Sequence, residues 1–495
     1  MKKRINELGI LLLAILFIGC PNPVTTTTNS ATSTSDHIAS TIVFSDGATV
    51  IKILGTWRYT NPVSGVGDGS VIYTSGNPDA ATVDARTGEV TPIAEGTTII
   101  TATKAATATN APVTAYYKVV IVKPVLPLLE ITTDNNHPIE DTENWIKGNV
   151  VISDNGVQTD LGKLEIKGRG NSTWGMSKKP YSLKLDKKAS VLGMESNKRW
   201  VILANYSDKT LLRTTFAFDL GLSVYNNLKW TPNSRMVEVV INSEYIGVYQ
   251  VVEQIRIDKK RVDIDTDKED FLMEVNARLD GKCNFKTTRG VCFSFNEPEE
   301  PDENKFNEIK EKLQEAEDAI YSDNFSDATD GYAKYIDVDS FIDWYLVNEF
   351  TKNNDASFYS SVYMYYKDSK IFMGPIWDFD ISSGNINYNG CDNPENYWIK
   401  NAMWISRLFD DASFVEKVKT RWNEKRSILQ DHIDEISDKA ADLNLAASSN
   451  FQRWDILNTY VWPNRVVTGS YKGEVLEIVA WLNKRYAWMD NELNK

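Results

Sequence analysis

Strand patterns dominate residues 128–300 of this chain and helical patterns dominate residues 304–495, which restricts the possible folds strongly. Short alternations of apolar and polar residues predict strands, among them Lys163–Lys167, Tyr181–Leu185, Met236–Ile241, Tyr245–Glu253 and Phe271–Val275. From residue 304 onward, apolar spacing predicts helices at Lys305–Tyr321, Val338–Lys352, Phe414–Leu443 and Glu474–Leu493. Strands followed by helices predict a two-lobed α+β body. A chain of 495 residues predicts two or three folding units.

The N-terminus has the pattern of a lipoprotein signal peptide over residues 1–19. A positive start, Met1-Lys-Lys-Arg, precedes an apolar run that is too short to span a bilayer comfortably, and the run ends at Phe17-Ile-Gly-Cys20. We expect lipid on Cys20, although Phe17 stands where Leu is usual; the alternative is secretion with an unmodified cysteine. Residues 20–38, rich in Thr and Ser, predict a flexible tether. The chain is thus expected to be an exported lipoprotein, anchored to a membrane in the periplasm or at the cell surface.

Charge and composition exclude several classes of partner and site. The formal net charge of −14 argues against nucleic acid as a partner, because phosphate binding needs a basic face. With three histidines, a His-based metal centre or catalytic triad is not expected. Cys283 and Cys292 flank a turn-like stretch, so a hairpin disulfide is one possibility; the alternative is that these two and Cys391 are three buried thiols.

Residues 39–124 predict a separate all-β domain. Alternating runs with Gly and Pro punctuation and no helical period indicate a small β-sandwich. The stretches at residues 72–83, 87–90 and 94–103 resemble the bacterial immunoglobulin-like group 2 (BIG2) domain, with Gly88 in a hairpin turn and Thr97–Thr103 as a core strand. Such a domain implies a spacer or an adhesion module at a cell surface.

Two acidic motifs in residues 125–495 predict a phosphotransferase. Asp355 follows Thr351-Lys-Asn-Asn, and Asp378 and Asp380 lie in Gly374-Pro-Ile-Trp-Asp-Phe-Asp. Asp355 and Asp378 are 23 residues apart, which is enough for a β-hairpin that brings both carboxylates to one cleft. Phosphoryl transfer needs a carboxylate at the acceptor hydroxyl and another at a metal ion. Trp377 is expected to line the cleft, whereas most other tryptophans are expected in the core.

A glycine-rich loop supplies candidate phosphate contacts after the strand Lys163–Lys167. Its small residues and free N–H groups suit a phosphate cradle, although many such loops are ordinary turns: Gly168, Arg169, Gly170, Asn171 and Ser172. The basic strand that follows offers Lys184 or Lys179 as the phosphate-binding lysine. The alternative is a solvated basic edge strand.

Several blocks in order along residues 128–495 resemble the CotH family of spore-coat and surface protein kinases. They lie at residues 168–174, 178–185, 200–213, 237–253 and 374–380, with Asn348, Glu349 and Asp355 between the last two. The resemblance implies an atypical protein-kinase-like fold, secreted or surface-associated. It also implies the use of ATP and a divalent metal, Mg²⁺ or Mn²⁺, to phosphorylate Ser or Thr hydroxyls.

The same resemblance assigns roles to individual residues. Asp355 is the expected acceptor-orienting carboxylate and Asp378 the expected metal ligand. Asp380 is either a second metal ligand or a cap of the following turn, and Glu253 is a candidate partner of the clamp lysine, Lys184. Ser360 stands where a protein kinase has its second metal-binding Asn, so that ligand has to come from elsewhere.

Three functions are compatible with these patterns. The first is an extracytoplasmic kinase that transfers the γ-phosphoryl of ATP to Ser or Thr of surface or secreted proteins. The second is a surface adhesion or binding lipoprotein whose kinase-like body is a scaffold without catalysis. The third, a carbohydrate-active enzyme using acid pairs, has less support because the tryptophans alone do not make a sugar cleft.

Overall fold

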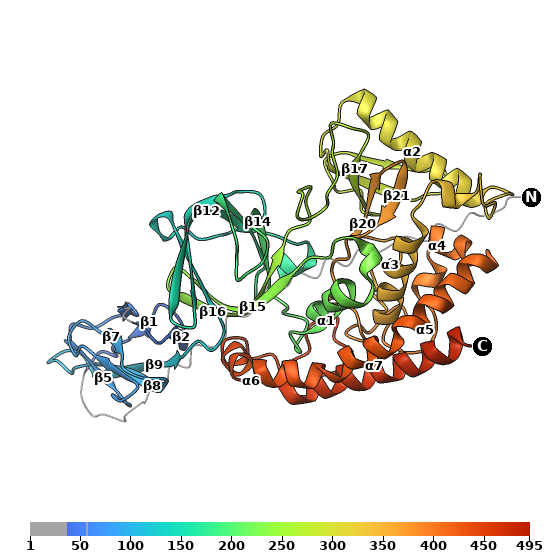
Figure 1. Cartoon of the computed structure of the whole chain (residues 1–495). Coiled ribbons are helices and arrows are strands. Elements are labelled where there is room, and N and C mark those ends of the chain that lie inside the picture. Colours follow the sequence, from blue (N-terminus) through green and yellow to red (C-terminus); the bar gives the residue numbers. More distant parts are fainter. Residues whose placement is uncertain (1–36, 56–57) are drawn as a thin grey trace, which may run out of the picture. The chain divides into compact units, whose positions relative to one another are not determined.

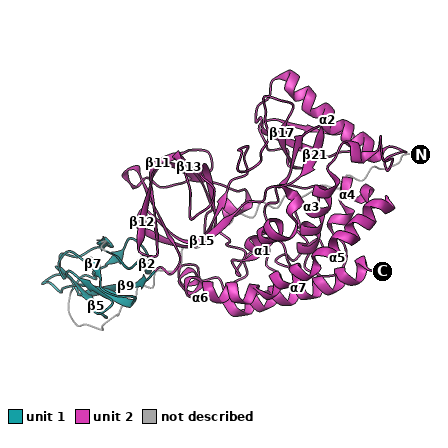
Figure 2. Cartoon of the chain, in the orientation of Figure 1, with its two compact units in different colours: residues 1–123 teal, residues 124–495 magenta. Residues whose placement is uncertain are grey.

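The computed structural model of the chain describes residues 37–55 and 58–495. The predicted signal peptide, Cys20 and the tether up to residue 36 lie outside the described residues. The chain divides into two compact units, residues 1–123 and 124–495 (Figure 2). No helix in the described ranges is both long and apolar enough to cross a membrane.

In the described part of the first unit, the regular elements are strands. One sheet has the order β2 (Thr49–Ile53), β9 (Val113–Val122), β8 (Gly96–Lys104) and β5 (Val71–Ser75); the second has β3 (Tyr59–Thr60), β7 (Glu89–Pro92) and β6 (Ala81–Val83). A short pair, β1 (Val43–Phe44) with β4 (Val63–Ser64), completes the unit. Tyr73, Ile100 and Tyr117 from the first sheet share one core with Val90 from the second. This confirms the β-rich, immunoglobulin-like region, including the core strand at Thr97–Thr103.

A closed barrel opens the second unit (Figure 1). Its strands follow one another in the order β10 (Leu128–Thr133), β11 (Ile146–Asp154), β12 (Val157–Gly168), β13 (Tyr181–Ala189), β14 (Asn197–Leu203), β16 (Glu244–Glu253) and β15 (Ser234–Ile241). Neighbouring strands are antiparallel, except that β10 and β15 pair in parallel and close the barrel. Alternate residues such as Ile166, Leu183 and Trp200 fill its interior. The basic strand Tyr181–Leu185 is therefore a barrel strand with neighbours on both sides and is not an edge strand.

A second sheet and the helices form the rest of this unit. The sheet has the order β18 (Asn284–Lys286), β19 (Cys292–Glu297), β17 (Phe271–Val275), β20 (Val362–Lys367) and β21 (Lys370–Met373). The helices are α1 (Arg213–Asp219), α2 (Glu303–Tyr321), α3 (Val338–Thr351), α4 (Met403–Leu408), α5 (Ala412–Asp434), α6 (Ile436–Arg453) and α7 (Tyr471–Leu493). Helix α3 is buried on nearly all sides and contacts β21, α5 and α7 (Figure 1).

Two local expectations need correction. The predicted helix Phe414–Leu443 is divided between α5 and α6 at Glu435, and no Gly or Pro in the sequence marks this break. Cys283 and Cys292 are free thiols. The strand register places Cys292 opposite Lys286, while the Cys283 carbonyl accepts from the N–H of Phe295, so the two cysteines do not face each other.

Candidate active site

A cavity of about 620 Å³ in the second unit collects most of the predicted site residues. It is lined by the loop that follows β12, by residues at the ends of β17 and β20, and by the segment after β21. Asp355, Asp378 and Asp380 all lie in its wall. The β20–β21 hairpin separates Asp355 from Asp378 in the sequence, as their spacing predicts.

The loop at residues 168–172 lines the cavity and depends on two glycines. A Cβ atom on Gly168 would lie 2.4 Å from the Trp174 ring. Gly170 has a φ of +84°, and a Cβ atom there would lie 2.1 Å from Thr173 Oγ1. Both glycines are therefore required for the loop to turn tightly against its own strand, so that Arg169, Asn171 and Ser172 line the cavity.

Arg169 is the cation that this loop brings to the acidic wall. Its guanidinium carbon lies 5.3 Å from the centroid of the Trp377 ring. Burial lowers the pKa of Arg169, while the charges of Tyr363, Asp378 and Glu274 act in the opposite direction. A guanidinium remains charged under these conditions and can bind phosphate oxygens in a bidentate manner.

Asp355 is held by its own segment just after α3. The side-chain amide of Asn354 donates to Asp355 Oδ1 at 2.7 Å, and the Ser360 hydroxyl is 3.3 Å from Oδ2. Burial and the negative charge of Asp378 raise the pKa of Asp355. Ser360 therefore orients the Asp355 carboxylate, which gives this position a role that the kinase comparison did not suggest.

Asp378 lies on strained backbone beside a second carboxylate. Its φ of +66° is in the left-handed region, which costs on the order of 1–3 kcal/mol for most residues and less for Asp and Asn. The Ser361 hydroxyl donates to Asp378 Oδ2 at 3.1 Å, and the Ser361 N–H donates to Glu274 Oε1 at 3.1 Å. Burial, with a contribution from Asp378, raises the pKa of Glu274 to about 7. Ser361 thus connects the two carboxylates.

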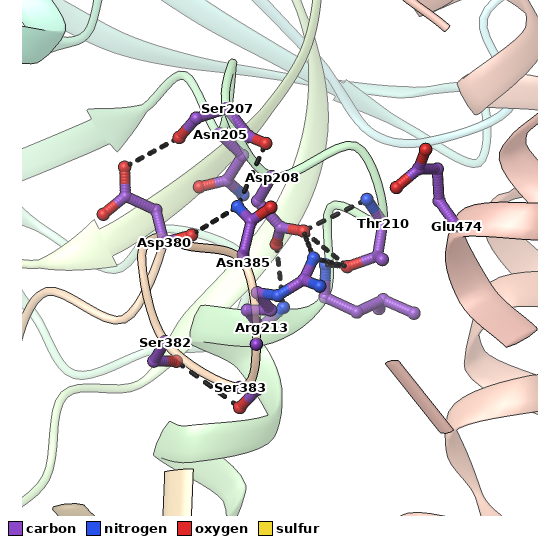
Figure 3. A network of polar contacts seen from close by, with 12 residues as sticks. Asn205, Ser207, Asp208, Thr210, Arg213, Asp380, Ser382, Ser383, Asn385 and Glu474 are labelled. Carbon is purple, nitrogen blue, oxygen red and sulfur yellow. Dashed lines mark hydrogen bonds and ion pairs between the residues drawn. The ribbon is translucent and has the colours of Figure 1, made fainter. Parts of the chain in front are cut away.

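Asp380 joins the cavity to a buried polar network (Figure 3). The Ser207 hydroxyl donates to Asp380 Oδ2 at 3.2 Å, and the Asn385 side chain donates to the Asp380 carbonyl at 2.7 Å. Next to Ser207, Asp208 forms a buried ion pair with Arg213 at 2.6 Å, and its other oxygen accepts from the Arg213 N–H where α1 begins. Burial and the charge of Asp378 raise the pKa of Asp380 to about 8. The carboxylate accepts from Ser207 and does not cap the turn at residues 382–384.

The cavity carboxylates fit a divalent cation that is held partly by the protein and partly by substrate phosphates. Within the described residues, no group of three or more His, Cys, Asp and Glu side chains is arranged to enclose a metal ion. Mg²⁺, however, is commonly held by one or two carboxylates together with substrate phosphates and water. Burial and the charge of Asp378 raise the pKa of Asp380, and neither carboxylate forms an ion pair with a Lys or Arg of the described chain. These two residues fit such a shared site.

Two family models match the chain. The model of the CotH kinase protein family matches residues 166–489, well over half of the chain. The chain belongs to the CotH kinase protein family. The bacterial Ig-like domain (group 2) model matches residues 59–115, so both resemblances inferred from sequence are confirmed. No curated protein matches the chain at a significant level.

In this CotH kinase protein, the predicted lysine clamp is not in the cavity. Lys184 forms an ion pair with Glu165 at 2.7 Å on the neighbouring strand, and Lys179 donates to the Trp174 carbonyl. Glu253 is buried and accepts from the N–H of Asn233 at 3.0 Å. The predicted Lys184–Glu253 pair is therefore wrong, because none of these three side chains lines the cavity. Arg169 and Arg278 are among the cations that do line it.

Sequence reasoning missed two charged residues of the cavity wall. Glu274 and Arg278 line the cavity, and neither belongs to a motif recognised in the sequence. Against the effect of burial, the Tyr359 hydroxyl and the charges of Asp355 and Asp280 raise the pKa of Arg278. One sequence feature could have identified Glu274 as a site residue: it is the single charged residue in the apolar strand Phe271–Val275.

Buried cations fix the segment that follows Asp380. Lys352 Nζ donates to the carbonyls of Gly390, Asn393 and Glu395 at 2.6–2.9 Å. Arg485 donates to two further carbonyls of this segment and to Glu349 Oε1 at 2.6 Å. The segment reaches the site through Asn389, whose side chain donates to Asn354 Oδ1 at 3.0 Å. The position of Asp355 therefore depends on two cations outside the cavity.

Proposed function

We propose that this CotH kinase protein is an extracytoplasmic, metal-dependent protein kinase that transfers the γ-phosphoryl of ATP to Ser or Thr hydroxyls of surface or secreted proteins. One observation carries the proposal. A single cavity contains a glycine-rich loop with an arginine, a carboxylate held by a hydroxyl and an amide, and a nearby carboxylate pair. These are the parts that phosphoryl transfer requires. The barrel and the second sheet form the two walls of the cavity and would correspond to the two lobes of a kinase-like fold.

Each wall has a separate task in this mechanism. A bound divalent cation, Mg²⁺ or Mn²⁺, would neutralise charge on the phosphates, and Asp378 and Asp380 would hold it. Arg169 and the backbone N–H groups of residues 170–172 would orient the phosphates. Asp355 would orient the acceptor hydroxyl and take its proton as the hydroxyl oxygen bonds to the γ-phosphorus. The bond from that phosphorus to the bridging oxygen breaks, and ADP leaves.

The test is phosphate transfer by the purified full chain. Labelled ATP with Mg²⁺ or Mn²⁺ and casein as the acceptor would be compared for the native protein, Asp355→Asn and Asp378→Asn. We expect each substitution to reduce transfer by about 10³-fold or more. Asp368→Asn, in the exposed turn between β20 and β21, is the matched control and should leave transfer unchanged. Metal-independent labelling, or labelling that survives both substitutions, would exclude this mechanism.

The bacterial Ig-like domain supports a second function, a surface-binding lipoprotein whose kinase-like body is a scaffold. Calorimetry with ATP and Mg²⁺ separates the two. The kinase predicts saturable nucleotide binding that weakens in Asp378→Asn. The scaffold predicts neither nucleotide binding nor transfer.

Export and membrane attachment are a further part of the proposal, supported by the sequence pattern at residues 1–20. In a bacterial host fed with labelled palmitate, the full chain should take up label and sediment with membranes. Cys20→Ser should lose both properties. Label that persists in Cys20→Ser would place the lipid elsewhere.

A further inference from the structure

Three cations surround one tryptophan on the outside of the barrel. Lys167 Nζ lies 5.2 Å, the Arg199 guanidinium carbon 5.1 Å and Lys184 Nζ 6.0 Å from the centroid of the Trp145 ring. The four side chains are half-buried, so each keeps contact with solvent. An indole ring attracts cations, but three around one ring also repel each other.

The strand register shows that two of these cations belong to a longer charged row. Lys147 of β11 pairs with Glu165 of β12, Glu165 with Lys184 of β13, and Lys184 with Arg199 of β14. The adjacent residues on these strands point into the barrel core, so the row lies on the outer face. We call these four residues together with Trp145 and Lys167 the outer row.

Positive charge exceeds negative charge in the outer row. Of the six described residues in the outer row, Glu165 is the one acid, and it forms an ion pair with Lys184 at 2.7 Å. The hydrogen bond from Lys184 lowers the pKa of Glu165. Burial acts in the opposite direction, and the charges of Lys184, Lys147 and Arg199 lower the pKa further. Lys147 and Arg199 have no carboxylate partner within ion-pair distance in the described chain. Two cations of this face therefore lack an ion-pair partner in the described chain, although the net charge of the sequence is −14.

The outer row is continuous with the candidate active site. Lys167 and Ser182, which are register partners, both line the cavity. Glu165 and Lys184 are the next pair on the same face, about 7 Å further along the strands. The chain before Trp145 also reaches the cavity through Thr142 and Glu143, and the Asp141 carbonyl accepts from the N–H of Gly168 at 2.9 Å. A polypeptide leaving the cavity can follow this face without interruption.

We propose that the outer row is a docking surface for an acidic stretch of the polypeptide substrate, adjacent to the residue that is phosphorylated. The identity of the ligand as a substrate rests on the proposed kinase function. Three strand spacings separate Lys147 from Arg199, about 14 Å, which matches roughly four residues of an extended peptide. Glutamate or aspartate side chains would neutralise Lys147, Lys184 and Arg199, and the Trp145 ring provides an apolar surface for the intervening residues.

Binding tests this surface independently of catalysis. The full chain carrying Asp378→Asn would be titrated against a fluorescent peptide with one Ser beside four Glu, and against the same peptide with Lys in place of Glu. We expect the Glu peptide to bind, with affinity falling as salt increases, and the Lys peptide not to bind. Adding Lys147→Glu and Lys184→Glu should weaken binding by about tenfold.

Control variants separate the outer row from general effects of charge. Lys118→Glu with Lys472→Glu makes the same change in net charge at exposed positions outside the row and should leave binding unchanged. If charge reversal destabilises the barrel, the neutral double variant Lys147→Gln with Lys184→Gln replaces it in the binding test. In transfer assays, this neutral variant should raise KM for the acidic peptide while kcat stays constant.

Three outcomes overturn the proposal. The first is that both row variants bind the Glu peptide as well as the parent chain does, and the second is that the Lys peptide binds more tightly than the Glu peptide. The third is that millimolar inorganic phosphate or phosphatidylglycerol vesicles displace the Glu peptide completely, which would identify a general anion or membrane site. Row-dependent binding of the Glu peptide by a native chain that transfers no phosphate would remove the kinase function and leave the docking surface in place.

Discussion

The second unit contains two sets of acids with different partners, one buried within the fold and one lining the cavity. Asp208, Asp343 and Glu349 each form an ion pair with an arginine, namely Arg213, Arg421 and Arg485. The pair Glu349–Arg485 is fully inaccessible to solvent, with 2.6 Å between oxygen and nitrogen. Asp355, Asp378 and Asp380 accept hydrogen bonds from hydroxyls and an amide instead.

We call the three arginine-paired residues the structural acids and the other three the cavity acids. A buried carboxylate without a cationic partner is unfavourable, and the cost increases when carboxylates lie together. Arg169 and Arg278 line the same cavity but do not form ion pairs with its acids within the described residues. The cavity acids therefore remain available to a cation from solution, whereas the structural acids are neutralised by the chain.

The largest expected contrast is between Asp378→Asn and Asp208→Asn. Asp378→Asn should reduce transfer by about 10³-fold or more, and it should unfold at the same or a higher temperature because it relieves repulsion with Asp355, Asp380 and Glu274. Asp208→Asn should unfold at a lower temperature, since it breaks a buried pair. Thermal unfolding and transfer assays on both variants check this. Equal destabilisation by the two substitutions would remove the distinction between the sets.

Breaking the most deeply buried pair should have a large effect on stability. Arg485→Met leaves the Glu349 charge buried without its partner, and we expect the free energy of unfolding to fall by about 3–5 kcal/mol. Urea titration measures the change. Lys334→Met, which removes an exposed pair with Asp330, is the control and should change stability by less than about 0.5 kcal/mol. A loss for Arg485→Met as small as that of the control would contradict this assignment.

A smaller effect is expected at Ser361, which contacts Asp378 without being a ligand itself. Ser361→Ala removes the hydroxyl that holds Asp378 Oδ2. The metal concentration for half-maximal transfer should rise by about tenfold, with little change in unfolding temperature. Ser326→Ala, at an exposed position, provides the comparison. If the metal requirement is identical in both variants, the hydroxyl does not position Asp378.

The smallest expected effect is the pH dependence due to Lys178. Its ammonium group donates to the Val248 carbonyl and to Asn450 Oδ1 at 2.9 Å, and burial lowers its pKa well below 10.5. The unfolded chain keeps this proton up to higher pH than the folded chain, so rising pH between the two pKa values stabilises the fold. Lys178→Met should lack this contribution. The unfolding temperature should be measured at pH 7 and at pH 9.5, and its change between the two should be more positive for the native chain than for Lys178→Met. An equal change in both proteins would show that Lys178 does not titrate in this range.

Local features of the site were predictable from sequence because they depend on neighbouring residues. The interval between Asp355 and Asp378 is filled by a hairpin whose length and aromatic alternation are visible in the chain. Gly168 and Gly170 also act locally, through a tight approach and a left-handed backbone. These features need no knowledge of which distant strands become neighbours.

Features set by tertiary register were not predictable in the same way. Lys184 pairs with Glu165 because β12 and β13 align those two residues. A comparison with the motifs of other kinases does not predict this alignment. Glu274 reaches the cavity only because β17 pairs with β20. The division between α5 and α6 at Glu435 also has no local marker.

The three carbonyls held by Lys352 have a consequence for control of the protein. In many kinases the segment after the metal-binding aspartate is ordered only when an added phosphate meets a free arginine. Here Lys352 and Arg485 already hold that segment through its backbone carbonyls, and Arg485 also pairs with Glu349. Under the proposed kinase function, ordering of this segment would therefore require no added phosphate.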